Sequence, residues 1–214
     1  MKTSERTVLK GYYWNHDAIR KDVSRLQNVA ERADSLNRDD YSKISRWYDH
    51  HKFALTEHHH AEDNFFFPMI SERTREFEDE LRQFDDEHHQ LDEQMEKMES
   101  LLNKLANDDG VDQDKMELID AIREYNQLVI NHLDKEEKIV EQSTSTHFSP
   151  VEILEKEAEF RTSMPQDKMA RLMPWMVDAM DDKDRKFFFS MLPFVPRLLY
   201  KWRLKKQYEK MTEF

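Results

Sequence analysis

Two histidine–glutamate pairs with the same spacing stand far apart in this chain. His58 is followed four residues later by Glu62, and His132 by Glu136. On an α-helix a separation of four residues places both side chains on one face, so each pair can hold a single point in space. Mixed imidazole and carboxylate ligation suits iron, manganese or zinc, and a carboxylate with two oxygens can span two ions. The pairs therefore indicate a metal site.

Two further histidines, His16 and His88, lie in the two other long amphipathic stretches. One ligand group on each of four helices is how a helical bundle builds a metal site in its core. A single pair of this kind usually faces solvent, but both pairs lie beside apolar stripes, where a buried imidazole or carboxylate needs a partner. A purely structural buried polar network is the alternative. We expect most of the remaining histidines to be solvated or to support the ligands: His50, His51, His59, His60, His89 and His147.

The composition indicates an all-helical protein without thiol chemistry. The 214 residues include only two glycines and six prolines, and no cysteine, so a metal must be held by nitrogen and oxygen. The net charge is −12, with −14 on residues 1–150 and +2 on residues 151–214. An acidic body does not attract nucleic acid or an anionic membrane surface. The chain lacks an apolar leader and any run of about 18 apolar residues. We therefore expect a cytoplasmic protein without stable membrane insertion.

The spacing of apolar residues predicts four long helices, broken where turn residues gather. Asp39 and Asp40 are candidate caps of the second helix, and Pro68 should kink or end it. The run from Asn107 to Gly110 is the clearest turn signal. The predicted fold is all-α, an antiparallel up-down-up-down four-helix bundle over residues 1–145 with a C-terminal helical extension over residues 146–214. The helices are expected over about 7–36, 41–68, 75–106 and 112–142, with a linker at 143–150.

The C-terminal extension ends in a basic amphipathic segment. Leu198, Leu199, Trp202 and Tyr208 stand among five Lys and Arg residues. Such a helix can bind a membrane surface or a nucleic acid. It can also dock its aromatic face on the bundle and cover apolar surface with its Lys and Arg stems. Docking is the favoured interpretation, because the bundle beside it is strongly acidic.

Four sequence blocks resemble the hemerythrin-like family with its HHE cation-binding domain. They are NHDAIRKDVSRL, EHHHAEDNFFFP, DEHHQL and NHLDKEE, in the family's order, and they cover about residues 10–142. The tail, with its Pro-Trp pair and later basic helix, is similar to that of some bacterial members. The resemblance implies a bundle that holds two non-haem iron ions. It also implies terminal ligands His16, His58, His88 and His132, with Glu62 and Glu136 as bridging carboxylates.

One position departs from the family's oxygen carriers. They have a second histidine four residues after the first on the third helix, and here that position is Asp92. Either Asp92 supplies an oxygen, or a water, a substrate or a tyrosine fills the place. Tyr125 and His51, each seven residues before a proposed ligand, could lie in the neighbouring layer. Six candidate ligands favour iron over zinc, since a closed zinc site needs only four; manganese is a further possibility.

Three functions are compatible with these residues. The first is a non-haem di-iron protein that binds oxygen or a related small oxidant for sensing, storage or protection. The alternative is a di-iron oxidoreductase that consumes peroxide, with catalase-like or peroxide-reducing activity at a position that the ligands leave open. The third is a metal-free structural bundle. The expected partner in the first two cases is a small molecule, O2 or H2O2.

Overall fold

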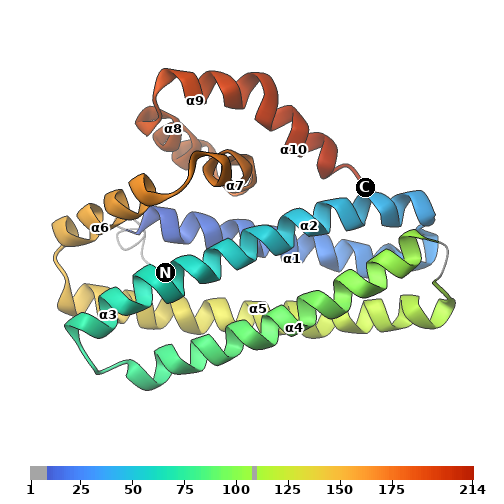
Figure 1. The fold of residues 1–214 in the computed structure, drawn as a ribbon, viewed down its shortest axis with the longest axis horizontal. Helices are drawn as coiled ribbons and strands as arrows, with labels where there is room; N and C mark the ends of the chain where they lie inside the picture. Colours follow the sequence, from blue (N-terminus) through green and yellow to red (C-terminus); the bar gives the residue numbers. More distant parts are fainter. Residues whose placement is uncertain (1–8, 108–109) are drawn as a thin grey trace.

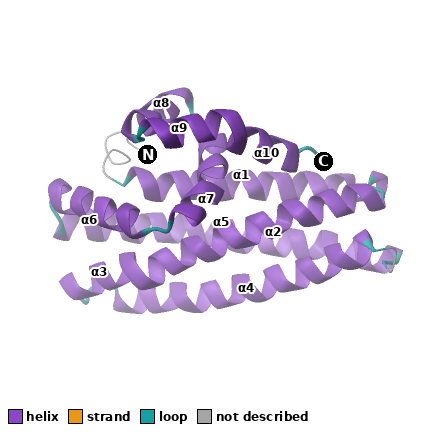
Figure 2. Cartoon of the chain, turned by 45° about the horizontal axis from the view of Figure 1, so that its top comes forward, coloured by secondary structure: helices purple, strands orange, loops and turns teal. Residues whose placement is uncertain are grey.

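The structure, a computed structural model, describes residues 9–107 and 110–214, and its regular elements are all helical (Figures 1 and 2). The all-helical prediction is therefore confirmed. The α-helices are α1 Lys10–Arg32, α2 Arg38–Ala61, α3 Phe67–Arg73, α4 Glu78–Ala106, α5 Asp112–His147, α6 Pro150–Ser163, α7 Gln166–Ala179, α8 Asp182–Met191, α9 Phe194–Leu199 and α10 Lys205–Met211. Three short helices complete them: the 3₁₀-helix η2 Ala33–Ser35 and the π-helices η3 Glu62–Phe66 and η4 Tyr200–Leu204.

The four long helices α1, α2, α4 and α5 lie side by side along the long axis of the molecule, and the C-terminal helices lie above them (Figure 1). Helix α2 packs on α4, α4 on α5, and α5 on α1. Helix α4 ends at Ala106 and α5 begins at Asp112, as expected. The expected start of the first helix at Thr7 lies outside the described residues, as do Asp108 and Asp109 of the expected turn.

The caps and ends of the helices differ in part from the prediction. The N-cap of α2 is Asn37, whose side chain accepts hydrogen bonds from the backbone N–H groups of Asp39 and Asp40. Asp40 reaches back to the N–H of Asn37 and so completes a capping box, whereas Asp39 has no such role. Helix α5 does not end near Gln142 but continues to His147, which leaves only two residues before α6.

The prediction that Pro68 would kink or end the second helix needs correction. The chain passes from α2 through the π-turn η3 into α3 and stays helical as far as Arg73. Pro68 stands at the start of α3, directly after η3, so the hydrogen bond that the proline cannot make falls at the junction of the two helices. The wider π-turn takes up the irregularity ahead of the proline. A π-turn inside a long helix is frequent at functional sites, and this one begins at Glu62.

Two apolar clusters form the core of the bundle. One surrounds Trp47, Leu91 and Leu133, and the other surrounds Phe66 and Phe84 near the α3 end. On each long helix, the proposed ligands stand in sequence between residues of the first cluster and residues of the second. The sequence therefore places a polar layer between two apolar layers, and the site described below lies in that layer.

The C-terminal extension packs on the bundle mainly through α7. Trp175 of α7 is buried, and Asp178 pairs with Lys21 and Arg25 of α1. The predicted docking of the basic segment holds for Tyr200 and Tyr208, which are buried, but other aromatic side chains there stay exposed. In the ranges that the structure describes, none of the helices is both long enough and apolar enough to cross a membrane.

Candidate metal centre

The bundle brings seven nitrogen and carboxylate donors together in two adjacent groups. The donor atoms of each group lie within 4.8 Å of one another, and every one of these residues is buried. The first group combines two imidazoles with two carboxylates, and the second contains three imidazoles. The first group is His16 of α1, His58 of α2, Glu62 of η3 and Glu136 of α5; the second is His59 of α2, His88 of α4 and His132 of α5.

The carboxylates of Glu62 and Glu136 belong to the first group and also approach histidines of the second. One oxygen of Glu62 is 3.1 Å from Nε2 of His58, and the other is 3.7 Å from Nε2 of His88. Oε2 of Glu136 lies 3.4 Å from Nε2 of His16 and 3.6 Å from Nε2 of His132. Two ligands at right angles around a shared ion, each about 2.1 Å from it, would be about 3.0 Å apart. The observed spacings are slightly wider and are compatible with ions on both sides of each carboxylate.

Three histidines are oriented by carboxylates on the far side of their rings. Nδ1 of His16 lies 3.1 Å from Glu137, Nδ1 of His88 lies 3.1 Å from Asp63, and Nδ1 of His132 lies 3.0 Å from Glu87. An Nδ1–H that donates to a carboxylate leaves the Nε2 lone pair directed at the centre. Histidines that bind metals almost always show this arrangement, which fixes both the tautomer and the ring orientation.

The supporting carboxylates are themselves held in place. Arg20 donates to Glu137 at 2.6 Å, and Lys135 donates to Glu87 at 2.7 Å. The hydrogen bond from His132, followed by those from Lys135 and Gln83, lowers the pKa of Glu87 to about 2. Glu87 is therefore an anion at neutral pH, and its hydrogen bond makes the imidazole of His132 a more basic ligand for a metal.

Several of the atoms that face the centre have no hydrogen-bond partner among the described residues. Within the described part of the chain, both oxygens of Glu62 and of Glu136 are buried and unpaired, and so is Nε2 of His58, His88 and His132. Burial and the neighbouring charge of Glu136 raise the pKa of Glu62 well above its usual range, and burial also raises the pKa of Glu136. Burying so many polar groups without hydrogen bonds costs free energy of folding. Divalent cations would supply the missing partners, so the residues fit a two-metal site.

Burial also favours the neutral form of His58 and His59, which is the form that binds a metal. Loss of hydration, followed by the charges of neighbouring histidines, lowers the pKa of His58 and of His59 well below the usual value. The ring of His59 stacks on that of His88 with centroids 3.9 Å apart. Two stacked imidazoles could not both carry a proton at this distance without strong repulsion.

The structure brings all six predicted ligands together but not Asp92. The side chain of Asp92 is exposed and belongs to neither group of donors. The inward-facing positions of α4 continue from His88 to Leu91 and Met95, at steps of three and four residues. Position 92 therefore lies beside this stripe rather than on it.

His59 was not among the predicted ligands, because we had expected it to be solvated or to support them. Adjacent residues point about 100° apart on a helix, so a single ion would use either His58 or His59 but not both. Two groups side by side give each of them a place. The run of three histidines from His58 to His60 was the available signal, and only His60 of that run is exposed. Of the others, His89 is exposed, and His50 and His147 bond to Arg171 and Glu76.

A second buried polar cluster lies next to the centre, and we refer to it as the Asp22 network. Asp22 accepts hydrogen bonds from His51 at 3.0 Å, Trp175 at 2.8 Å and Arg25 at 2.7 Å. The other ring nitrogen of His51 is 2.6 Å from the hydroxyl of Tyr125. Tyr125 and His51 thus lie in the neighbouring layer as expected, but they bond to each other.

Tyr12 lies on the opposite side of the centre, one turn before His16. Its ring centroid is 4.1 Å from that of His16, and its hydroxyl is buried without a hydrogen-bond partner in the described ranges. Burial, and after it the carboxylates of Glu136 and Glu62, raise the pKa of Tyr12 well above the usual value. The phenol is therefore neutral and close to the proposed bridging groups. The spacing of four residues from His16 was a signal that we had not used.

Comparison with known proteins agrees with this geometry. Residues 14–142 match the family described as hemerythrin HHE cation binding domain, a stretch that contains all seven donors. No curated protein and no solved structure matches the chain. The match covers more than half of the 214 residues. The chain therefore belongs to the hemerythrin HHE cation-binding family.

Proposed function

We propose that the protein is a non-haem di-iron protein that binds oxygen or a related small oxidant for sensing, storage or protection. The observation that carries this proposal is the pair of donor groups with two buried, unpaired carboxylates between them. Iron suits mixed imidazole and carboxylate ligation, although manganese and zinc share part of this preference. When bound, iron would supply redox chemistry that the side chains lack.

In this proposal each ion has its own imidazoles and shares the carboxylates. His16 and His58 would hold the first ion, while His59, His88 and His132 would hold the second, and Glu62 and Glu136 would bridge them. The first ion then has four protein ligands and the second has five. An octahedral ion has six positions, so both keep room for a small molecule. The proposal includes the up-down-up-down order of the four long helices, which the short connections between them support.

The same open positions favour a second candidate, a peroxide-consuming di-iron oxidoreductase. The first ion would have the fewer protein ligands, and two of them, His58 and Glu62, also line a cavity described below. An exposed first ion suits turnover of peroxide better than a fully enclosed one. Sustained release of oxygen from hydrogen peroxide by the iron-loaded protein would favour the enzyme, and its absence would favour the binding protein.

The division of the chain also belongs to the proposal. We infer a metal-binding bundle over residues 1–145 and an extension over residues 146–214, although α5 runs two residues past this boundary. The division is supported by the position of all seven donors in the first part.

The decisive experiment is the metal content of purified variants loaded with ferrous iron without air. We expect two ions per wild-type chain. Glu62→Ala and Glu136→Ala should each lose the pair, because each removes a bridge between neighbouring cations. His59→Ala should lose one ion, in contrast to our expectation from sequence.

His60→Ala is the matched control, since His60 neighbours His59 but is exposed. It should keep both ions, as should Asp92→Ala. Two ions per chain in both glutamate variants would refute the bridging assignment, and two ions in His59→Ala would return His59 to a supporting role.

A further inference from the structure

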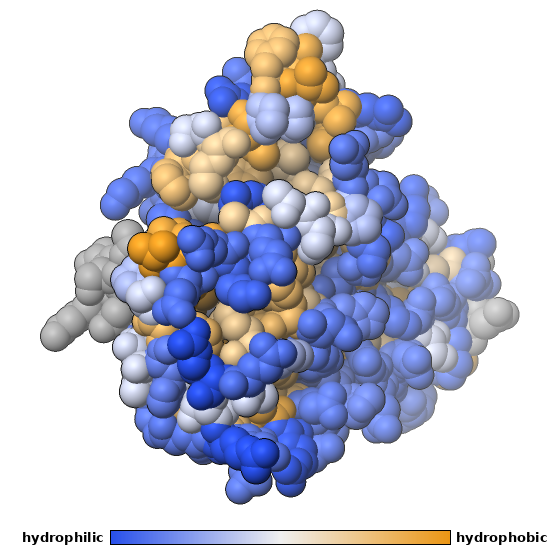
Figure 3. Space-filling model, turned by 60° about the vertical axis from the view of Figure 1, so that its left-hand side comes forward, coloured by the Kyte–Doolittle hydropathy of each residue, from blue (hydrophilic) through white to orange (hydrophobic). Residues whose placement is uncertain are grey.

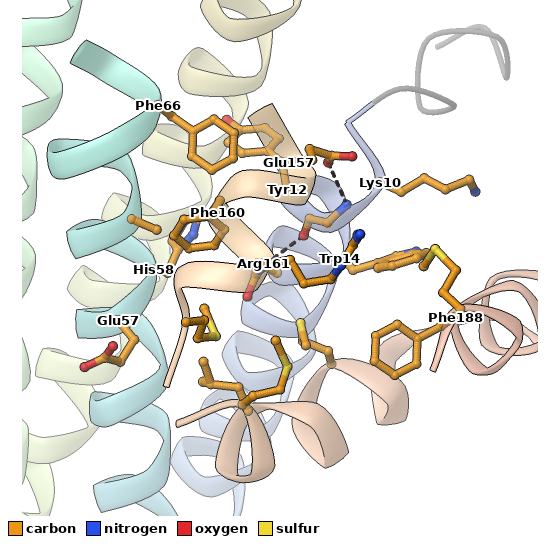
Figure 4. Close-up of a pocket in the computed structure, with 18 of the residues that line it drawn as sticks. Lys10, Tyr12, Trp14, Glu57, His58, Phe66, Glu157, Phe160, Arg161 and Phe188 are labelled. Carbon is orange, nitrogen blue, oxygen red and sulfur yellow. Dashed lines mark hydrogen bonds between the residues drawn. The ribbon is translucent and has the colours of Figure 1, made fainter. Parts of the chain in front are cut away.

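A cavity of about 290 Å³ lies where the extension meets the bundle, and it reaches the metal centre (Figure 4). His58 and Glu62 line one end of it, together with Tyr12. Helices α6, α7 and α8 supply much of the remaining wall. Figure 3 shows apolar side chains on the face where these helices meet the bundle, within a largely hydrophilic surface.

The wall of this cavity is mainly aromatic and thioether. Phe160 of α6 packs against Phe66 with ring centroids 5.8 Å apart, and Phe188 of α8 packs edge-on against Trp14 at 5.6 Å. Four methionines complete the lining: Met164, Met169, Met176 and Met191. Such a surface favours an apolar occupant and adapts to its shape.

Most charged groups around the cavity are compensated or face solvent. Lys10 pairs with Asp184 at 2.6 Å and Glu57 with Lys168 at 2.7 Å, the carboxyl group of Glu157 accepts a hydrogen bond from the backbone of Gly11 at 3.2 Å, and Arg161 is exposed to water. Burial raises the pKa of Glu157 to about 7, so this group carries only part of a charge at neutral pH. An ionic ligand would lose its hydration here without gaining a full counter-charge.

The size of the cavity sets the size of its occupant. An apolar cavity of about 150 Å³ is large enough to bind benzene, whereas one water takes about 30 Å³. A diatomic oxidant therefore does not need a cavity of this volume. About twice the benzene volume suits a molecule of ten to twelve non-hydrogen atoms.

We propose that this cavity binds a neutral, mainly apolar organic molecule of about this size, with one hydroxyl or carbonyl oxygen that accepts a hydrogen bond from Tyr12. The hydroxyl of Tyr12 is closed off from solvent and without a partner in the described ranges, while other atoms of the residue line the cavity, so the phenol has to turn toward the cavity to donate to the ligand. This inference concerns binding alone and holds for any metal in the centre. The polar end of the molecule would lie beside His58, next to the first ion.

The test is calorimetric titration of the full chain, metal-loaded and chelated, with 2-naphthol, naphthalene and 2-naphthalenesulfonate. We expect 2-naphthol to bind once per chain in both states and the sulfonate to bind at least about tenfold more weakly. Tyr12→Phe should weaken the binding of 2-naphthol by about three- to tenfold and leave the binding of naphthalene unchanged.

Two filling variants locate the binding. Met169→Trp and Leu154→Trp both add a ring to the lining, and Leu154 is exposed enough for folding to tolerate the change. Both should abolish binding, whereas Met211→Trp, outside this cavity, should not. No binding by the wild type, or equal binding by the filled variants, would overturn the proposal. Metal content is measured on the same samples. A chain that binds no metal can then be distinguished from a chain that does not bind 2-naphthol.

A different observation supports a second inference, about the tip formed by α9 and the following turn. Phe194, Val195 and Trp202 are 75%, 70% and 73% exposed. In Figure 3 apolar side chains also gather at the top of the view, which is the extension. Large apolar side chains gathered on a surface mark an interaction site.

The charge around this tip is opposite to that of the rest of the molecule. Residues 185–208 contain seven Lys and Arg and no Asp or Glu, although the whole chain carries −12. Arg197, Lys201, Arg203, Lys205 and Lys206 of this segment are all exposed. Apolar residues at the tip and cations around them are the pattern of a segment that lies in a membrane interface, where tryptophan is also favoured.

We propose that this tip binds the surface of a membrane that contains anionic lipid. Lipid is favoured over nucleic acid because phosphate contacts alone would leave Phe194, Val195 and Trp202 exposed. Each Lys or Arg near an anionic surface adds to the attraction. The protein would rest on the membrane without crossing it.

Sedimentation with vesicles tests this proposal. The full chain should bind vesicles of phosphatidylcholine with about 30% phosphatidylserine, bind pure phosphatidylcholine at least about tenfold more weakly, and lose binding in high salt. Trp202→Ser should weaken binding at least about tenfold, since it removes a large apolar anchor.

Met116→Ser is the matched control, because Met116 is an exposed apolar residue on α5, outside the tip. Equal effects of the two substitutions, or no binding by the wild type, would overturn the proposal. Binding to duplex DNA that Trp202→Ser leaves intact would assign the cations to nucleic acid instead. A dimer that Trp202→Ser dissociates would assign the tip to a second copy of the chain.

Discussion

The candidate metal centre and the Asp22 network are two buried polar clusters that share helices α1, α2 and α5, and they differ in how completely they are paired. In the Asp22 network, Asp22 receives three donors and His51 uses both ring nitrogens. In the metal centre, the oxygens of Glu62 and Glu136 find no hydrogen bond in the described ranges. Burial costs free energy in both clusters. Only in the Asp22 network do hydrogen bonds within the protein offset this cost.

The pKa values show the same contrast. Burial disfavours the anion of Asp22, yet the hydrogen bond from His51 and the charge of Arg25 outweigh it and lower the pKa of Asp22. Burial dominates at Glu62 and Glu136, and both pKa values rise. A cluster that is complete without a ligand stabilises the fold under all conditions. An incomplete one makes stability depend on what binds there.

Metal loading should produce the largest effect. Two ions that each exceed their dissociation constant by 100- to 1,000-fold add about 5–8 kcal/mol to the free energy of unfolding. For a chain of this size the melting temperature should rise on the order of 10–20 °C. Thermal unfolding of chelated and iron-loaded protein measures the shift. Glu136→Ala, which removes a bridge, should show little response, and a wild-type protein that melts at one temperature in both states would support a metal-free structural role.

Breaking the paired cluster should have the next largest effect. Asp22→Ala leaves Arg25, His51 and Trp175 without their acceptor and should lower the free energy of unfolding by about 3–5 kcal/mol. The loss should be the same with and without metal, because the network is complete on its own. Urea unfolding in both states measures it.

Asp120→Ala is the control for this substitution, because Asp120 is exposed on α5. It should change the free energy of unfolding by less than about 0.5 kcal/mol. A loss from Asp22→Ala that is clearly smaller in iron-loaded than in metal-free protein would contradict the separation of the two clusters.

Much of the candidate site could be predicted from sequence because it depends on local geometry. The i, i+4 spacing of His58 with Glu62 and of His132 with Glu136 requires only a helix. His16 and His88 needed the further inference that four helices share one core. The family resemblance then supplied the pairing into a two-metal site.

The missed features depend on tertiary packing. His59 joins the centre because two donor groups lie side by side, which no single helix face reveals. Asp92 was misplaced because α4 follows the step of three residues to Leu91, so that position 92 turns away from the seam. The cavity near Tyr12 requires α6, α7 and α8 to fold back over the bundle, and the sequence of the extension gave no direction for that packing.

The two clusters should change stability with pH in opposite directions, because the pKa of Glu136 is raised and that of Asp22 is lowered. The contribution of Asp22 is lost as pH falls, and that of Glu136 is lost as pH rises. In metal-free protein, burial raises the pKa of Glu136 to about 8, while the unfolded chain ionises this group near its ordinary value of about 4.3. The folded state then binds more protons than the unfolded state, and stability falls as pH rises through about 8. The histidines with lowered pKa values act in the opposite direction, but only below their unfolded value of about 6.5.

The clean window is therefore about pH 7.5 to 9, where the expected loss in metal-free protein is about 0.8 kcal/mol. Urea unfolding across this range measures it. Glu136→Gln should flatten the slope. Glu157→Gln should change it much less, since Glu157 has a pKa of about 7 and is already mostly ionised where this window begins. An unchanged slope in Glu136→Gln would show that this carboxyl group is ionised even without metal.

The smallest expected effect comes from two buried tyrosines that differ in pairing. The hydroxyl of Tyr125 is 2.6 Å from His51, while that of Tyr12 has no partner in the described ranges. Tyr125→Phe should lower the free energy of unfolding by about 0.5–1.5 kcal/mol, because it removes a hydrogen bond and keeps the ring. Tyr12→Phe removes a polar group that is buried without a hydrogen bond. The stability of metal-free protein should therefore be unchanged or slightly higher. Urea unfolding of both variants measures the difference. A loss in Tyr12→Phe as large as that in Tyr125→Phe would show that the Tyr12 hydroxyl is paired in solution, and the cavity would then lack the free donor on which its ligand was inferred.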